Sequence, residues 1–208
     1  MTRAAARKAT LLTAARQAMA EHGSGVQLRQ IAQRAGISPG AVLYHYPDLS
    51  DLLIEANRAG MERFYSDRCA AVADLTDPAE RLVSTILLGV PRSRADEDVR
   101  LLCSLGGEAS RNTVYAILLT SLYDRQVQMY TSILEAGAQQ GDFTLCAPVQ
   151  TVARNLVALE DAYGYRIMAG HPALDYPTAV TLILDYARLA TNHPLPAAPI
   201  AVPAEESP

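Results

Sequence analysis

Residues 28–46 (LRQIAQRAGISPGAVLYHY) constrain the fold of this chain more than any other stretch, because they predict two short helices joined by a tight turn. Leu28, Ile31, Ala32 and Ala35 recur at the i, i+3, i+4 and i+7 spacing of a short amphipathic helix. This spacing places one narrow apolar stripe on the first helix, and such a stripe needs a second helix to cover it.

The turn between the two helices contains the residues that its geometry requires. Gly36 can adopt the positive φ that ends a helix, Ser38 is a good N-cap, and Pro39 suits the first helical position. A second helix is therefore expected to begin at Pro39, with Val42 and Tyr46 facing the core. The pattern indicates a helix-turn-helix whose outer face can enter a DNA major groove, although an ordinary corner between two helices uses the same residue types.

The charge of the chain is divided unevenly. Residues 1–50 contain six basic and two acidic residues, a formal charge of +4, whereas the other 158 residues contain 12 arginines and 20 acids, a charge of −8. The whole-chain charge of −4 hides this contrast. A basic first quarter on an acidic remainder is expected when one end of a protein meets phosphate.

The first 55 residues resemble the N-terminal domain of the TetR family of bacterial regulators. The resemblance is carried by an amphipathic helix, residues 23–25 (GSG), the helix-turn-helix, and residues 44–47 (YHYP) followed by 51–53 (DLL). It implies an all-α fold in which a three-helix helix-turn-helix head is joined by a long helix to a helical body that binds an effector and dimerises. The rest of the chain resembles the family only in architecture.

The resemblance also implies which residues contact DNA. They lie at the start of the first short helix and on the second: Gln27, Arg29, Ser38, Pro39, Gly40, Ala41, Tyr44 and His45. Arg29 is the best candidate for a guanine contact, with a phosphate contact as the alternative, and Tyr44 either contacts DNA or covers the core of the small domain. Leu43 and Leu49 stand where family members often have a phosphate-binding Tyr and Lys, which predicts weaker or less salt-sensitive DNA binding.

Residues 1–20 are rich in alanine and basic residues, a composition shared with transit peptides. We interpret them instead as the first helix of the head, because a helical stripe leads directly into the helix-turn-helix. The stripe consists of Leu11, Leu12, Ala15, Ala18 and Met19. No apolar run reaches the ~20 residues that a membrane span requires, so no membrane partner is expected.

The remaining sequence predicts a chain of helices, at about 49–75, 76–88, 96–109, 113–140, 148–169 and 177–191. Three regions are expected: a DNA-binding domain of residues 1–48, an effector-binding and dimerisation domain of residues 49–192, and a disordered, Pro-rich tail of residues 193–208.

The last two predicted helices are apolar on more than one face, and a monomer covers only one side of each. They predict a four-helix homodimer interface, which the resemblance also implies, with a central position in a monomer as the alternative. The interface candidates are Val152, Leu156, Leu159, Glu160, Tyr163, Val180, Ile183, Leu184 and Ala187.

Two acids in this region, Glu160 and Asp161, have no basic residue at helical spacing, so their partners must come from elsewhere. An ion pair across the dimer seam with Arg154, Arg166 or Arg188 is expected, because buried acids are usually paired. Recognition of a cationic effector is the alternative.

The resemblance implies an effector pocket within the helical body. Its candidate lining residues are Tyr65, Cys103, Glu108, Tyr115, Leu119, Tyr123, Gln126 and Tyr130. Because an aromatic stripe at helical spacing is more often core than pocket, a core position is the alternative for each of them.

The residue inventory argues against an enzyme. Lys8 is the only lysine and belongs to no phosphate-binding Gly-Lys-Ser/Thr loop, and the four histidines have no metal-ligand spacing. Cys69, Cys103 and Cys146 are isolated thiols, as expected in a reducing cytoplasm. We therefore expect no catalytic activity, no metal and no cofactor.

Together, the residues and the resemblance predict a cytoplasmic, homodimeric transcriptional repressor. It would bind a pseudo-palindromic operator in double-stranded DNA and be released by a small-molecule effector of unknown identity. The alternative is an all-helical small-molecule-binding protein or enzyme whose helix-turn-helix does not bind DNA.

Overall fold

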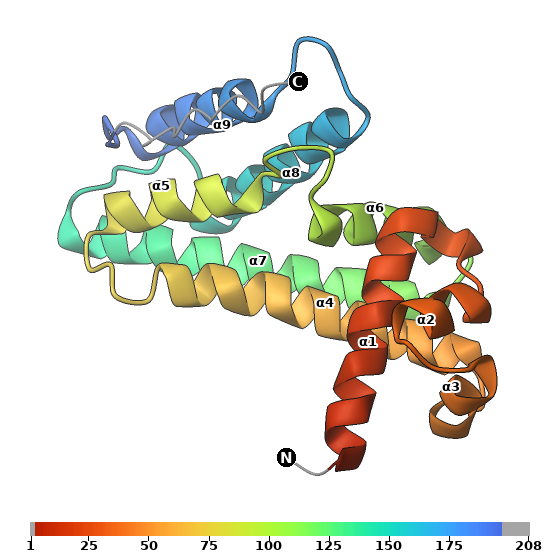
Figure 1. Ribbon diagram of the computed structural model, residues 1–208. Helices are drawn as coiled ribbons and strands as arrows, with labels where there is room; N and C mark the ends of the chain where they lie inside the picture. Colours follow the sequence, from red (N-terminus) through yellow and green to blue (C-terminus); the bar gives the residue numbers. More distant parts are fainter. Residues whose placement is uncertain (1–2, 197–208) are drawn as a thin grey trace, which may run out of the picture. The chain divides into compact units, whose positions relative to one another are not determined.

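The computed structural model describes residues 3–196, and every regular element in this range is helical (Figure 1). The elements are α1 (Arg3–His22), the short 3-10 helix η1 (Gly23–Gly25), α2 (Leu28–Arg34), α3 (Pro39–His45), α4 (Leu49–Ala71), α5 (Pro78–Gly89), α6 (Glu97–Ala109), α7 (Thr113–Gln140), α8 (Val149–Met168) and α9 (Tyr176–Thr191). The predicted all-α fold is confirmed. None of the described helices is both long and apolar enough to cross a bilayer.

The predicted helix bounds agree with the structure to within about two residues, the usual uncertainty of a helix end, except at the end of α4. This helix stops at Ala71, before the expected Leu75. Residues 1–2 and 197–208, and with them most of the predicted tail, lie outside the described residues. The described start of that tail packs on the protein: Leu195 is buried, and Arg188 Nε donates to the Pro194 carbonyl oxygen at 3.1 Å.

The described chain divides into two compact units. Residues 3–67 and 94–126 form the first unit, and residues 68–93 and 127–196 form the second. The predicted functional division at residue 48 stays a prediction.

The core of the first unit joins the N-terminal helices to α6. Buried residues of α1, α2, α3 and α4, among them Leu11, Ile31 and Val42, share one cluster with Leu101 of α6. Gly60 of α4 makes this approach possible, because a Cβ added there would lie 2.7 Å from Leu101 Cδ2. The head formed by α1, α2 and α3 thus uses an α6 side chain to complete its core.

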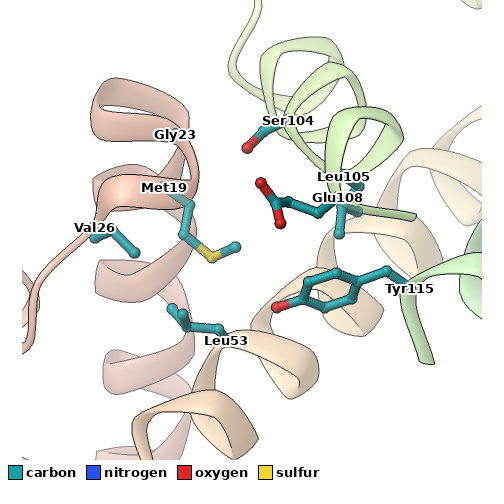
Figure 2. Close-up of a pocket in the computed structure, with 8 residues that line it drawn as sticks. All are labelled: Met19, Gly23, Val26, Leu53, Ser104, Leu105, Glu108 and Tyr115. Carbon is teal, nitrogen blue, oxygen red and sulfur yellow. The ribbon is translucent and has the colours of Figure 1, made fainter. Parts of the chain in front are cut away.

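A cavity of about 130 Å³ lies in the same unit (Figure 2). Met19 of α1 and Leu53 of α4 line one part of it, and Glu108 of α6 and Tyr115 of α7 line another.

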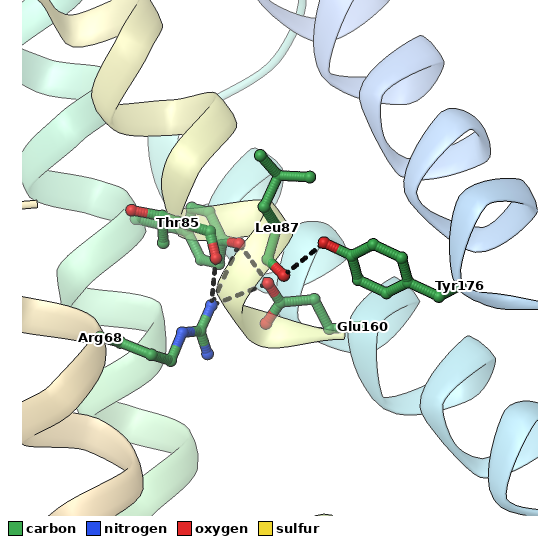
Figure 3. A network of polar contacts seen from close by, with 6 residues as sticks. Arg68, Thr85, Leu87, Glu160 and Tyr176 are labelled. Atoms are coloured by element: carbon green, nitrogen blue, oxygen red, sulfur yellow. Dashed lines mark hydrogen bonds and ion pairs between the residues drawn. The ribbon is translucent and has the colours of Figure 1, made fainter. Parts of the chain in front are cut away.

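The second unit contains a buried polar network (Figure 3). Arg68 Nη2 lies 2.8 Å from Glu160 Oε1 and also donates to the Thr85 carbonyl oxygen at 2.9 Å. The Tyr130 hydroxyl donates to the same Glu160 oxygen, and Arg68, Tyr130 and Glu160 are all nearly inaccessible to solvent. Burial raises the pKa of the Glu160 carboxyl, and Arg68 and Tyr130 counteract this by stabilising its charged form.

This network corrects the partner predicted for Glu160. The expected partners were Arg154, Arg166 or Arg188 of a second copy, whereas the observed partner is Arg68 of the same chain. Arg68 lies 92 positions earlier in the sequence, so helical spacing within α8 could not have identified it. Arg188 instead forms an ion pair with Asp185 at 2.8 Å.

The network leaves room for only a glycine at position 89. A Cβ on Gly89 would overlap Glu160 Oε1 and lie 2.5 Å from Arg68 Nη2. We expect Gly89→Ala to lower the free energy of unfolding by about 1–3 kcal/mol, the usual cost of inserting a methyl group into a packed interior. Urea unfolding followed by circular dichroism measures this change.

Gly107→Ala is the matched control, because a Cβ at that helical position meets nothing within 4 Å. It should leave stability unchanged or raise it by up to about 1 kcal/mol through better helix propensity. Equal effects of the two substitutions would contradict a steric role for Gly89.

Candidate functional site

The helix-turn-helix is held by a complete set of backbone hydrogen bonds. Gly36 has φ +66°, and the Ile37 N–H donates to the Ala32 carbonyl oxygen at 3.0 Å while the Gly36 N–H donates to that of Gln33 at 3.2 Å. These two bonds form the Schellman motif that ends α2. Ser38 Oγ then accepts from the Ala41 N–H at 3.2 Å and caps α3.

The inner side of α3 is anchored in the core, as predicted. Val42 is fully buried and Tyr46 is nearly so, and the Tyr46 hydroxyl donates to Glu55 Oε2 at 2.9 Å. Glu55 also forms an ion pair with Lys8, whose Nζ lies 2.8 Å from Glu55 Oε1. The orientation of α3 is therefore fixed from one side only.

The outer side of this motif is exposed to solvent. Seven of the predicted DNA contacts are exposed and Ala41 is half-buried; the seven are Gln27, Arg29, Ser38, Pro39, Gly40, Tyr44 and His45. Tyr44 is 85% exposed, which excludes the alternative that it covers the core of the small domain. Its ring meets the His45 imidazole edge to face, with 5.4 Å between the centroids.

The basic residues of the head differ in their partners. Arg34 pairs with Glu21 of α1 and Lys8 with Glu55 of α4, so part of the positive charge of the head is neutralised. Arg29 is exposed, and within residues 3–196 its side chain has neither an ion pair nor a hydrogen bond. Among these three cations, Arg29 is the one available to an anionic ligand.

The cavity brings together two of the predicted effector-pocket residues, Glu108 and Tyr115. Its other lining residues are Met19, Gly23, Val26, Leu53, Ser104 and Leu105. The sequence did not indicate these six. Four of them belong to the head or to the start of α4, where no local pattern indicates contact with α6.

The other pocket candidates lie elsewhere. Tyr65 stacks under the Arg125 guanidinium at 3.9 Å, and Leu119 packs against the apolar cluster of Met61, Leu105 and Leu122. Gln126 and Tyr130 are buried and do not line the cavity, nor do the half-buried Cys103 and Tyr123. Across residues 3–196, no three His, Cys, Asp or Glu side chains gather into a possible metal site.

Most of the predicted dimer-interface residues are buried inside the single chain. The fully or nearly fully buried ones are Val152, Leu156, Glu160, Val180, Ile183, Leu184 and Ala187, and only Leu159 and Tyr163 are half-buried. The reason is that α8 and α9 pack on each other and on α5, and they use these apolar faces to do so. The exposed large apolar residues of the two helices are Tyr165, Leu182 and Leu189.

Comparison with known proteins identifies the N-terminal segment. Residues 11–56 match the sequence profile of bacterial regulatory proteins of the tetR family. This segment therefore has the sequence pattern of the N-terminal part of that family. No curated protein matches the sequence significantly.

Solved structures extend the TetR-family likeness to the whole fold. A protein of Saccharomonospora viridis named as a transcriptional regulator and solved in complex with choline superposes with a TM-score of 0.82 at 23% identity, covering 88% of this chain and 96% of that one. A TetR transcription regulator from Haloarcula marismortui gives a TM-score of 0.80 at 22% identity, covering 89% of this chain and 98% of that one. A transcriptional regulator from Rhodococcus sp. Rha1 gives 0.75 at 21% identity, covering 89% and 96%. The chain therefore has the fold of TetR-family transcriptional regulators.

The Ser38 cap can be tested apart from DNA binding. Ser38→Ala removes the acceptor for the Ala41 N–H and should lower the free energy of unfolding by about 1 kcal/mol. Ser38→Asn keeps a side-chain acceptor and should restore most of this loss. Thermal or urea unfolding measures both, and an equal loss in both variants would show that the cap is not what stabilises the turn.

Proposed function

We propose that this chain is a transcriptional repressor that binds operator DNA as a homodimer and releases it when a small molecule binds. The observation that carries the proposal is the exposed outer face of α2 and α3, held rigidly from the inner side by Val42 and Tyr46. The match of residues 11–56 to the tetR-family profile supports the same conclusion. Such a regulator acts where the chromosome lies, in the cytoplasm.

The proposed contacts divide into two kinds. Arg29 supplies either a bidentate guanine contact or a phosphate contact, and Tyr44 and His45 reach phosphate or base edges from the exposed end of α3. Ser38 offers one hydroxyl, and Ala41 offers a methyl group to a thymine. Leu43 cannot bind phosphate, and Leu49 packs against the core of the head, so this head makes fewer phosphate contacts than its charge alone would permit.

The dimer face is assigned to exposed residues of α8 and α9. Tyr165, Leu182 and Leu189 are 46%, 41% and 76% exposed. A two-fold contact between these surfaces would bury all three residues on both subunits. Two heads related by this symmetry would read half-sites about one helical turn (~34 Å) or somewhat more apart.

Two observations support release from DNA by a small molecule. The cavity with Glu108 and Tyr115 has walls from both the head and α6, so a ligand there would act directly on the DNA-binding element. The Saccharomonospora viridis protein of the same fold was solved with choline bound.

DNA binding is tested first by selecting preferred duplexes from a random library and measuring affinity by fluorescence anisotropy. Arg29→Ala should weaken binding to the selected duplex by about 5-fold to 100-fold, the range for loss of one good base contact. Arg111→Ala, which removes an exposed arginine from the α6–α7 connection, is the charge-matched control and should bind nearly as tightly as wild type.

A titration with salt distinguishes the two roles of Arg29. Loss of a phosphate contact lowers the salt slope by about one, whereas loss of a guanine contact leaves the slope unchanged and relaxes specificity at one position. Failure to select any sequence, or equal affinities of the two arginine variants, would contradict the proposed interface and favour a small-molecule-binding protein that does not read DNA through α2 and α3.

A further inference from the structure

The cavity of the first unit has a mixed wall that suits one chemical class of ligand. Val26, Leu53 and Leu105 make its surface mainly apolar, and Met19 adds a thioether (Figure 2). Its volume of about 130 Å³ suits a small organic molecule.

Glu108 places a carboxylate among these apolar groups. In Figure 2 its oxygens lie between Ser104 and the ring of Tyr115. Burial, and after it the charge of Glu108, raise the pKa of the Tyr115 phenol, as expected for an acid close to that hydroxyl.

No protein cation neutralises this carboxylate within residues 3–196. Three arginines of the unit pair with other acids: Arg16 and Arg63 with Asp98, and Arg125 with Glu62 at 2.7 Å. Glu108 itself forms neither an ion pair nor a side-chain hydrogen bond among the described residues. A cation entering the cavity would therefore find a carboxylate that no cation of the described chain occupies.

A buried amide behind the wall adds a second unpaired acceptor. Asn57 is fully buried, and its Nδ2 donates to the Leu53 carbonyl oxygen at 2.8 Å and lies 4.0 Å from Met19 Sδ. Its Oδ1 has no hydrogen-bond partner in the part of the chain that the structure describes. Among the described residues, the Asn57 amide oxygen is thus a second acceptor without a partner beside the cavity.

We propose that this cavity binds a small alkylated ammonium, with Glu108 as its counter-ion and the Tyr115 ring and Met19 thioether against its alkyl groups. A methylated ammonium suits the site because its positive charge is spread over apolar groups that pack well on an aromatic face. This inference rests on the proposed function in one respect, since it identifies the class of effector. Because Met19, Gly23 and Val26 belong to the head and Ser104 and Glu108 to α6, the ligand would favour whichever placement of the head on α6 accommodates it.

The test uses the full chain without DNA and choline chloride as the probe. Isothermal titration calorimetry and the shift in melting temperature both report binding, with sodium chloride at equal concentration as the ionic-strength control. The neutral carbon isostere of choline, 3,3-dimethyl-1-butanol, has nearly the same shape and no charge. We expect choline to bind and the isostere to bind at least tenfold more weakly, because the isostere cannot pair with Glu108.

Two glutamate substitutions locate the charge. Glu108→Gln should weaken choline binding by about tenfold to a hundredfold. Glu135→Gln, at an exposed position of α7, removes the same charge outside the cavity and should bind choline as wild type does. If Glu108→Gln does not fold, Glu108→Asp, which keeps the charge but withdraws it by one methylene, should give an intermediate loss.

Equal binding of choline and its isostere, or unchanged binding in both Glu108 variants, would overturn the inference. Absence of choline binding by a protein that still binds its selected duplex would also overturn it and leave the proposed DNA-binding function standing. Choline binding by a protein that selects no duplex would support the cation site while refuting the repressor.

Discussion

The contact between Leu101 of α6 and the core of the N-terminal helices is the constraint on which the rest of the first unit depends. Leu101 is only 1% exposed and sits in the same cluster as Leu11, Ile31 and Val42 of the head. Gly60 permits this approach by having no side chain where Leu101 arrives. Because the core of the head includes a residue of α6, the head cannot move independently of α6. A change in this packing therefore changes the position of α3.

The cavity lies in the same part of the structure, so a ligand bound there would act on the packing that holds the head. Its walls include the end of α1, the η1 turn and α6, the segments whose packing holds the head. A ligand with different affinities for two arrangements of these segments would shift the population between them, and DNA affinity would change by the same coupling free energy. No contact between the ligand and α3 is required.

Features determined by local chemistry were predictable from the sequence. Gly36, Ser38 and Pro39 each have a specific backbone role, so the turn and the start of α3 were placed correctly, and the bounds of α7 were predicted at Thr113 and Gln140. The exposed face of α3 followed from the same periodicity. The end of α4 was placed too late because Ala71 is followed by no glycine or proline before Pro78.

Features determined by long-range packing were not predictable. The partner of Glu160 comes from Arg68, far away in sequence, and the apolar faces of α8 and α9 look alike whether they cover each other or a second copy. Met19 and Val26 resemble ordinary core positions of the head, and only the tertiary structure shows that they border a cavity with Glu108.

Photo-crosslinking from α3 tests the central claim most directly. Tyr44 is replaced by p-azidophenylalanine, which keeps the ring at the most exposed aromatic position of the helix, and the same replacement at the exposed Gln139 of α7 serves as the control. Irradiation with a selected duplex should give a covalent protein–DNA adduct from position 44 and none from position 139. An adduct from position 139 alone, or from neither position while the protein remains bound to the duplex, would contradict the claim that this chain reads DNA through the outer face of α3.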